Sequence, residues 1–357
     1  MHVHKKDTKK RKKYWVLSAK KTAAHRLLYC RKAEKFFRGF IKTQITQIVI
    51  VRYTKMNGMI TDIERFALND GPGIRTTVFF KGCNMRCAWC HNPETINMGK
   101  DLHYYANKCI SCYKCVYACP SKAHKRINNI HMFYPRLCVK CGKCADICYA
   151  GAMEMSGRKV DVEDVMGEIL QDKPYYVTSG GGVTLSGGEV LCQQEFAGAL
   201  TDACHAEGIS VGIESNLSFP WAQISPFIDK LDIVMCDMKL ADSEQHKKWT
   251  GVGNEQILEN IAHLAETGKP FIVRTPIIPG ATDSDDNILR IAQYLAKVNT
   301  KGTLMYYELL NFNPLGASKY ESLGRADAFK DAKPLPEARM QQLKALAEGA
   351  GIPVRAD

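Results

Sequence analysis

Eleven of the fifteen cysteines lie between Cys83 and Cys148, and this concentration limits what the chain can fold into. The stretch has few long apolar runs, so it cannot gain much stability from a hydrophobic core. Thiolates at such density are ligands for soft metals or iron–sulfur clusters, whereas disulfides are typical of secreted proteins. The sequence therefore predicts a segment that folds around metal. The other cysteines are predicted to be structural or free: Cys30, Cys192, Cys204 and Cys236.

The first cysteine motif has the spacing C-x3-C-x2-C and comprises Cys83, Cys87 and Cys90. Three thiolates can hold three irons of a four-iron cluster, which leaves the fourth iron free to bind a small chelating molecule. The alternatives are an ordinary electron-transfer cluster and a zinc site with His91 as fourth ligand. Zinc ribbons, however, use paired C-x2-C motifs, so the spacing favours an open iron–sulfur cluster.

Two further runs have the spacing of bacterial ferredoxins, in which the fourth cysteine of each run ligates the other cluster. The expected ligands of one cluster are Cys109, Cys112, Cys115 and Cys148. The expected ligands of the other are Cys138, Cys141, Cys144 and Cys119. Clusters closed by four thiolates can only pass electrons, so we expect them to relay electrons to the open cluster or to shield it. A purely structural role is the alternative.

Outside this window, apolar runs alternate with amphipathic stretches. Strands are predicted at 75–80, 183–185, 211–214, 233–236, 271–275 and 305–309. Helices are predicted near 162–171, 193–207, 241–249, 254–266, 284–297 and 336–349. This alternation predicts βαβ units, a mostly parallel sheet and an α/β fold. The predicted domains are a leader at 1–58, a main domain at 59–99 and 156–357, and an inserted domain at 100–155.

The net charge of +12 comes entirely from the leader. Residues 1–55 carry 17 Lys or Arg against 2 acidic residues, and the remainder is slightly acidic. A basic arm for nucleic acid or anionic membrane is one interpretation. The other, which we favour, is that translation starts at Met56 or Met59 and that the leader is untranslated or disordered. We therefore expect a cytoplasmic protein with neither a nucleic-acid nor a membrane partner, and no apolar run predicts a membrane span.

The first motif resembles the signature of the radical S-adenosylmethionine (SAM) superfamily, C-x3-C-x-aromatic-C, with Trp89 in the aromatic position. The resemblance implies that the open iron binds the methionine amino and carboxylate groups of SAM. A low-potential electron then cleaves the sulfonium bond to give a 5′-deoxyadenosyl radical. The Gly187-Gly188-Glu189 segment, which follows a predicted strand, matches the family segment that contacts the methionine amino group.

Residues 65–83 and 90–95 are similar to the activating enzymes of glycyl radical enzymes, and the similarity extends from residue 60 to about 355. Pyruvate formate-lyase activating enzyme has the same core without the two-cluster insert. The resemblance implies a partial (β/α)6 TIM-like barrel with an inserted ferredoxin-like domain, acting as a monomer. It implies hydrogen abstraction from a backbone glycine of a partner enzyme, with reduced flavodoxin or ferredoxin as electron donor. The implied cofactors are SAM, three 4Fe-4S clusters and a monovalent cation.

The resemblance also carries site residues to this chain. The implied catalytic residues are Cys83, Cys87, Cys90, Asp237 and Lys239. The implied cofactor-binding residues are Trp89, Gly187, Gly188, Glu189, Glu214, Ser215, Met235, Arg274 and Asn313. Among these, Glu214, Ser215 and Met235 match the cation site of the family. Asn313 departs from it, because the pyruvate formate-lyase activator has a His there; Asn can hydrogen-bond but cannot become cationic.

Two other functions fit parts of the sequence. A radical enzyme that acts directly on a small molecule would share the first motif, and it would not leave a glycine radical on a protein. A multi-cluster electron carrier would share the ferredoxin runs, but it would not consume SAM. The open motif together with the Gly-Gly-Glu segment argues against a simple carrier. No motif identifies the glycyl radical enzyme that would be activated.

Overall fold

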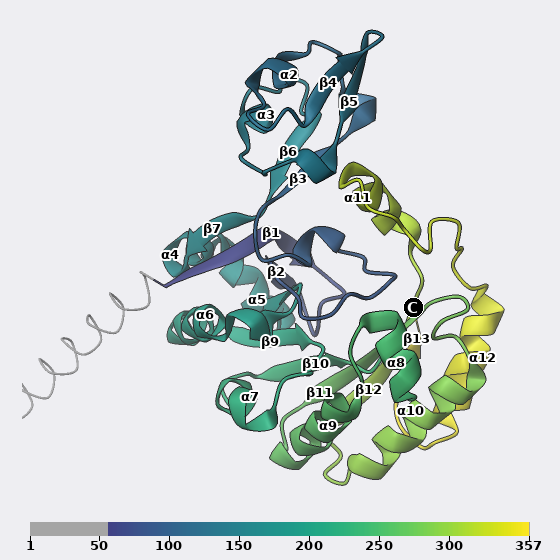
Figure 1. The fold of residues 1–357 in the computed structure, drawn as a ribbon. Coiled ribbons are helices and arrows are strands. Elements are labelled where there is room, and N and C mark those ends of the chain that lie inside the picture. Colours follow the sequence, from purple (N-terminus) through teal and green to yellow (C-terminus); the bar gives the residue numbers. More distant parts are fainter. Residues whose placement is uncertain (1–55, 357) are drawn as a thin grey trace, which may run out of the picture. The chain divides into compact units, whose positions relative to one another are not determined.

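The computed structural model describes residues 56–356, and the leader prediction falls almost entirely on residues outside this range. A nine-stranded sheet runs through the described part in the order β13-β12-β11-β10-β9-β8-β2-β1-β7 (Figure 1). The parallel strands are β2 (Arg75–Phe80), β8 (Gly182–Gly187), β9 (Ser210–Ser215), β10 (Ile233–Asp237), β11 (Phe271–Ile277), β12 (Leu304–Asn311) and β13 (Val354–Ala356). The predicted α/β fold with a largely parallel sheet is confirmed.

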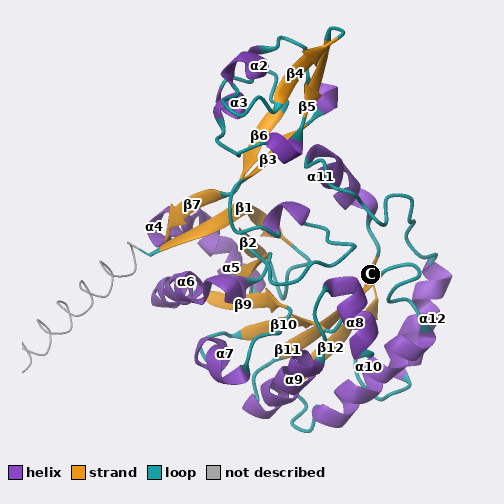
Figure 2. Cartoon of the chain, in the orientation of Figure 1, coloured by secondary structure: helices purple, strands orange, loops and turns teal. Residues whose placement is uncertain are grey.

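Helices alternate with these strands, and most of them cover the outer side of the curved sheet, whereas α11 lies beside the insert (Figure 2). They are α4 (Val162–Ile169), α5 (Lys173–Ser179), α6 (Gln194–Ala206), α7 (Trp221–Ile228), α8 (Ser243–Thr250), α9 (Glu255–Thr267), α10 (Asp285–Val298), α11 (Ala317–Ser322) and α12 (Glu337–Glu348). Short 3₁₀ turns are η1 (Pro93–Thr95), η2 (Ala106–Lys108), η3 (Pro135–Leu137), η4 (Leu170–Asp172), η5 (Val190–Gln193) and η6 (Pro314–Gly316).

Every predicted strand and helix of the main domain is present, with ends that differ by a few residues. Three of these helices, α4, α8 and α10, begin at a residue whose side chain caps them. Asp161 accepts a hydrogen bond from the Asp164 backbone N–H at the start of α4, and Ser284 accepts one from the Asn287 N–H at the start of α10. Such caps satisfy backbone donors that have no partner within the helix. Local chemistry thus explains why the helices begin at these residues.

The sequence analysis missed the elements at the two edges of the sheet. Strand β1 (Asn57–Ala67) pairs antiparallel with β2 and with β7 (Arg158–Asp161), and the short β13 lies at the other edge. Helix α7 was missed because it has only two turns and contains Pro226. The three missed strands lack the long apolar runs that identify a strand buried on both faces.

The cysteine-rich segment folds as a small unit that is bounded by a strand pair. Strand β3 (Asp101–Tyr104) pairs antiparallel with β6 (Met153–Ser156), so the two ends of the segment meet. Between them lie α2 (Lys114–Ala118), the hairpin of β4 (His124–Ile127) and β5 (Ile130–Phe133), and α3 (Lys143–Asp146). We call residues 101–156 the insert. Its apolar centre is small and contains cysteine side chains, which agrees with a segment that folds around metal.

The parallel strands place the candidate site residues. Cys83 follows β2, and Gly187, Ser215 and Asp237 are the last residues of β8, β9 and β10. Because the carboxyl ends of parallel strands lie at one edge of a sheet, segments far apart in the sequence meet there. Within residues 56–356, no helix is both long enough and apolar enough to cross a bilayer.

Candidate active site

A cavity of about 290 Å³ opens at the carboxyl ends of the parallel strands, and we call it the strand-end cavity. Three loop cysteines, the ends of the five strands β8 to β12 and the segment after β12 form its wall. Its lining includes Cys83, Cys87, Trp89, Cys90, His91, Gly187, Gly188, Glu214, Ser215, Asn216, Asp237, Lys239, Phe312 and Asn313. The fold therefore brings the C-x3-C-x2-C motif together with most of the predicted cofactor-binding residues.

Backbone hydrogen bonds fix the loop that carries the three cysteines. The Cys83 N–H donates to the Ile96 carbonyl at 3.0 Å, and the Ala88 N–H donates to the Trp249 carbonyl at 2.9 Å. Trp89 is buried beneath the loop, where its ring contacts Trp249 and Phe329. The aromatic residue of the motif thus packs the loop as well as lining the cavity.

The three thiols of the strand-end cavity suit a metal cluster. Burial raises the pKa of Cys83 and of Cys90 to about 12, and burial also raises the pKa of Cys87. Buried thiols of this kind ionise only when a cation compensates the charge. The cavity provides three sulfur ligands and open space beside them, so these residues fit an iron–sulfur cluster with one iron left free.

The two glycines of the Gly-Gly-Glu segment let the backbone of β8 approach the cysteine loop. Gly187 has φ +105°, and a Cβ atom there would lie 2.5 Å from the Phe80 backbone nitrogen. A Cβ on Gly188 would lie 2.3 Å from the Gly82 carbonyl oxygen. Any side chain at either position would collide with backbone, so the close approach requires glycine.

Glu189 is fully buried and is absent from the cavity lining. Its carboxylate accepts hydrogen bonds from the Ser215 hydroxyl and the Asn216 N–H, both at 2.8 Å, and from the Leu191 N–H at 3.0 Å. Burial nevertheless raises its pKa to about 7. The geometry therefore gives Glu189 a supporting position behind the wall, where it holds the end of β9 against β8.

Asp237 and Lys239 form an ion pair at the end of β10, with 2.5 Å between the carboxylate and Nζ. Lys239 is buried, so its ammonium group is not a solvated surface charge. Although burial opposes it, the charges of Asp237 and the nearby Cys87 raise the pKa of Lys239. The lysine is therefore a fixed cation on the wall of the cavity, close to the cysteine loop.

Arg274 lies away from the strand-end cavity, between two carboxylates. Its Nε donates to Glu308 at 2.6 Å, Nη1 pairs with Glu214, and Nη2 donates to the Asn69 carbonyl at 2.8 Å. Arg274 and Met235 line a neighbouring cavity of about 480 Å³, which shares the Glu214 and Ser215 walls. Because Arg274 already neutralises Glu214, the monovalent cation site at Glu214, Ser215 and Met235 stays a prediction.

Two asparagines lie near the cysteine loop, and the sequence analysis identified only one of them. Asn216 was missed: its amide donates to the Asn84 side chain at 3.0 Å, which ties the end of β9 to the cysteine loop. Its position directly after a predicted strand was the available signal. Asn313, which was predicted, lines the cavity and accepts a hydrogen bond from the Leu315 N–H at 3.0 Å.

The insert brings its cysteines together in two groups. Cys109, Cys112, Cys115 and Cys148 line one small cavity, which Cys144 borders. The electrostatic neighbours of Cys144 are Cys138 and Cys119. The first group, and the proximity of Cys119 to Cys144, agree with the ferredoxin ligand pattern, in which each run contributes its fourth cysteine to the other cluster. The donor sets therefore fit two closed clusters.

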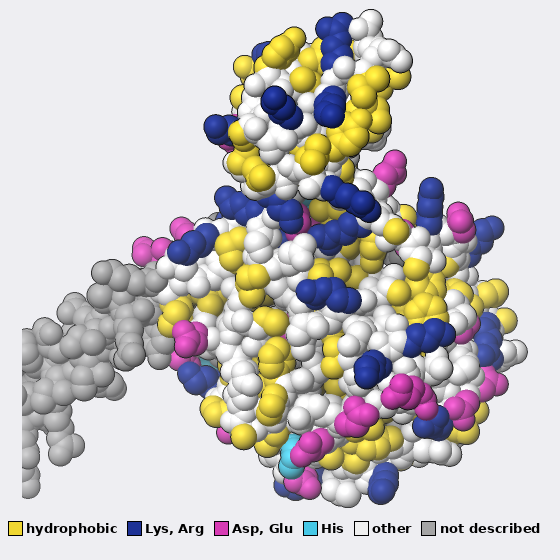
Figure 3. Space-filling view, in the orientation of Figure 1, with side chains coloured by type: hydrophobic (Ala, Val, Ile, Leu, Met, Phe, Trp, Pro, Cys, Tyr) yellow, Lys and Arg dark blue, Asp and Glu magenta, His cyan; other side chains and the backbone are white. Residues whose placement is uncertain are grey.

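The surface of the insert is basic and partly apolar. Residues 101–156 contain eight Lys or Arg and three Asp or Glu. Tyr117 and Tyr149 are both 84% exposed, and Lys114 lies over the Tyr149 ring. Figure 3 shows hydrophobic and basic side chains side by side on the insert, at the top of the view. The insert therefore carries net positive charge next to exposed aromatic side chains.

Comparisons with known proteins give one consistent result. Residues 138–292 match the Radical SAM superfamily, and residues 102–123 match the 4Fe-4S binding domain family. The chain is 37% identical over 301 residues to the (2S)-3-sulfopropanediol dehydratase activating enzyme of Klebsiella oxytoca, a match that covers 82% of this chain and 93% of that protein. A match of this length necessarily includes Cys83, Cys87 and Cys90.

Two further relatives have the same degree of identity. The indoleacetate decarboxylase activating enzyme of Tractidigestivibacter scatoligenes is 37% identical over 309 residues, which are 84% of this chain and 96% of that protein. The benzylsuccinate synthase activating enzyme of Thauera aromatica is 37% identical over 279 residues, which are 76% of this chain and 83% of that protein. The target enzymes in these names differ, whereas the activating role is shared.

Proposed function

This chain belongs to the glycyl radical enzyme activating enzymes of the radical SAM superfamily, and on that premise we propose how its residues divide the work. Cys83, Cys87 and Cys90 hold an open four-iron cluster in the strand-end cavity. The eight insert cysteines hold two closed clusters. The chain thus carries three clusters, and only the first one meets SAM.

One observation carries this proposal. The cavity that contains the three motif thiols also contains the glycine backbone of β8 and the Asp237–Lys239 pair, although these segments are far apart in the sequence. A ligand that binds an open iron there would lie against exposed backbone of Gly187 and Gly188. It would also lie beside a fixed acid–base pair. These groups suit the amino and carboxylate ends of a methionine.

When bound, the open cluster would supply the electron that cleaves SAM to methionine and a 5′-deoxyadenosyl radical, which takes a hydrogen atom from the partner's glycine. The chain's own residues orient the cofactor and exclude water. Gly187 and Gly188 admit the methionine end, and Glu189 fixes the β8 and β9 ends from behind. Lys239, held by Asp237, provides positive charge near the cofactor carboxylate, and Asn313 offers a neutral amide on the facing wall.

The partner is a glycyl radical enzyme, and we propose a small acidic electron carrier, a reduced flavodoxin or ferredoxin, as the donor. The basic surface of the insert and its exposed tyrosines support this choice, because opposite charges steer brief encounters. The names of these relatives refer to a dehydratase, a decarboxylase and a synthase, so they set no single substrate for the partner of this chain.

The test is an anaerobic turnover assay on the full-length chain. The reconstituted protein is reduced with dithionite, mixed with SAM, and assayed for 5′-deoxyadenosine and for iron. About twelve irons per chain are expected for three four-iron clusters. The Cys83→Ala variant is expected to lose about a third of the iron and all 5′-deoxyadenosine formation.

A matched control is Cys204→Ala, which removes a buried thiol of α6 that lies in the core beside Met166. This variant should keep both its iron and its turnover. Undiminished cleavage of SAM by Cys83→Ala would refute the assignment of the open cluster. A wild-type protein that holds all its irons and does not cleave SAM, even when candidate partner enzymes are added, would instead indicate an electron carrier.

A further inference from the structure

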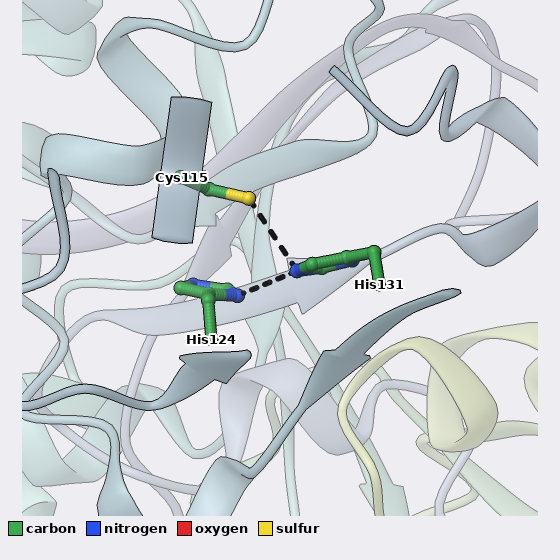
Figure 4. A group of neighbouring side chains, drawn as sticks. All are labelled: Cys115, His124 and His131. Atoms are coloured by element: carbon green, nitrogen blue, oxygen red, sulfur yellow. Dashed lines mark hydrogen bonds between the residues drawn. The ribbon is translucent and has the colours of Figure 1, made fainter. Parts of the chain in front are cut away.

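Two buried histidines of the insert lie close to the sulfur of Cys115, a ligand that we assign to the first insert cluster, and His131 contacts this sulfur directly (Figure 4). His124 begins β4 and His131 lies in β5, so the hairpin places both rings on one of its faces. They are 2% and 6% exposed. Neither was singled out in the sequence, because nothing in the spacing shows that a hairpin folds them back over the cysteines.

The contacts of the His131 ring are specific. Its Nε2 lies 3.4 Å from the Cys115 sulfur and 3.1 Å from Nδ1 of His124. Its Nδ1 lies 3.9 Å from the Cys109 sulfur. Tyr104 packs edge-on against the ring, with 4.9 Å between the centroids, which restricts its rotation. Both ring nitrogens of His131 therefore face sulfur ligands of one cluster.

In either tautomer, the His131 ring donates a hydrogen bond toward a cysteine sulfur. If the proton is on Nε2, His131 donates toward the Cys115 sulfur and the His124 nitrogen. If it is on Nδ1, His131 donates toward the Cys109 sulfur and accepts from His124. A cluster thiolate has no proton of its own to donate, so His131 is always the donor in the contact with sulfur.

We propose that His131 is a positioning residue that donates an N–H···S hydrogen bond to the first insert cluster and thereby raises the reduction potential of that cluster alone. The inference rests on the proposed ligand assignment of Cys109, Cys112, Cys115 and Cys148. A donor close to a ligand sulfur stabilises the additional negative charge of the reduced cluster, and hydrogen bonds to sulfur are a recognised control of cluster potential.

The second insert cluster provides an internal comparison. Its assigned ligands Cys138 and Cys119 accept hydrogen bonds from the backbone N–H groups of Lys140 and Ala123, at 3.3 and 3.2 Å. Those donors cannot be removed by a side-chain substitution. The Ser121 hydroxyl also lies 3.5 Å from the Cys119 sulfur. In the described residues, a histidine donor is present at the first insert cluster and not at the second, so a change at His131 should affect the first cluster alone.

The experiment is a potentiometric titration of the full-length, three-cluster protein, monitored by electron paramagnetic resonance. The wave of the open cluster is identified by its response to SAM. In His131→Phe, one of the two remaining waves should move to more negative potential by at least a tenfold change in the reduction equilibrium, about 59 mV for one electron. The other wave and the iron content should not change.

Two conservative variants separate hydrogen bonding from packing. An asparagine amide can reach the position of Nδ1 and a glutamine amide the position of Nε2, so His131→Asn or His131→Gln should restore the wild-type potential. Which of them restores it identifies the donor atom. They also provide a measurement if the phenylalanine variant does not fold. His103→Phe is the matched control, because His103 is a buried insert histidine whose Nδ1 bonds to Ser322 at 2.8 Å instead of to sulfur.

Several outcomes would overturn the inference while leaving the proposed function intact. Unchanged potentials in His131→Phe with all irons present would remove the donor role. An equal shift in His103→Phe would show a general packing effect. One zinc per chain, lost in His131→Phe, would show that Cys115, His124 and His131 hold a separate metal ion, since their ligand atoms lie within 4.8 Å of one another. Failure of the wild type to bind the two insert clusters would instead contradict the proposed function itself.

Discussion

Lys81 and Asp101 form a buried ion pair with 2.9 Å between Nζ and the carboxylate, and this pair joins the strand that precedes the cysteine loop to the first residue of the insert. Lys81 is completely buried and Asp101 is 2% exposed. Asp101 also pairs with Lys140, which lies between two cysteines of the second ferredoxin run, and with Arg325. One carboxylate therefore ties the open-cluster loop, the insert and the segment after α11 together.

Replacing Asp101 by Asn should destabilise the protein, because it leaves the Lys81 charge buried without its partner. Removing one member of a buried ion pair costs about 3–5 kcal/mol. We expect a lower unfolding temperature and faster loss of the insert irons under a chelator, measured by thermal unfolding and iron release. Asp146→Asn is the control, because Asp146 is an exposed carboxylate of the same insert. Equal stability of the two variants would contradict this network.

Replacing Lys239 by Met should impair turnover without loss of the open cluster. The side chain keeps its length and loses the charge that Asp237 holds toward the cavity. A misplaced cofactor can cost about 10²-fold in rate, so we expect a loss of this size in 5′-deoxyadenosine formation. The control is Lys230→Met, which breaks an exposed pair with Asp202. Turnover equal to that of the control would remove Lys239 from the site.

Replacing Arg274 by Lys should be far from conservative. The guanidinium spans Glu214 and Glu308 while also bonding to the Asn69 carbonyl, and a lysine ammonium cannot reach all three groups. One buried carboxylate is then left unpaired, which costs about 3 kcal/mol or more. Chemical denaturation should show this loss. If the double variant Arg274→Lys with Glu308→Gln regains the lost free energy of unfolding, the loss is due to the unpaired carboxylate. If the added Glu308→Gln change restores no stability, the unpaired charge is not the cause.

Binding of SAM should strengthen as the pH rises from about 6 to 8, in a manner that depends on Glu189. Burial raises the pKa of this carboxyl to about 7, so it is largely protonated at the lower pH. The permanently cationic sulfonium favours the ionised carboxylate and lowers that pKa, so binding releases a proton and affinity gains from higher pH. Calorimetry in buffers of different ionisation enthalpy measures this release. Glu189→Gln should lose this component of the pH dependence; the same proton release in both proteins would assign it to another group.

Removing iron should unfold the insert and leave the main domain folded. The insert has only a small group of buried apolar side chains, and this group packs against cysteines. The main sheet, in contrast, has an extensive hydrophobic core of its own. After chelation, hydrogen exchange should lose its protection in residues 109–148 while strands β9 to β12 keep theirs. Retained protection throughout the insert would mean that packing alone supports it.

The cysteine groups and the alternation of strands and helices could be predicted from the amino-acid sequence. The three cysteine runs lie within short segments, so their spacing is readable without any long-range contact. The apolar runs of β8 to β12 and the amphipathic pattern of α10 are likewise local signals, and each predicted element is present. The Gly187-Gly188 pair was recognisable in the same way.

The contacts between side chains that are distant in the sequence follow from the three-dimensional fold. Glu189 turns away from the cavity to bind Ser215 and Asn216, which sequence motifs alone could not reveal. The His124–His131 contact needs the hairpin, and the Lys81–Asp101 pair needs the insert to return to the sheet. These contacts depend on chain reversals and strand register, which place residues together through the packing of whole elements. That is why their partners cannot be read from local periodicity.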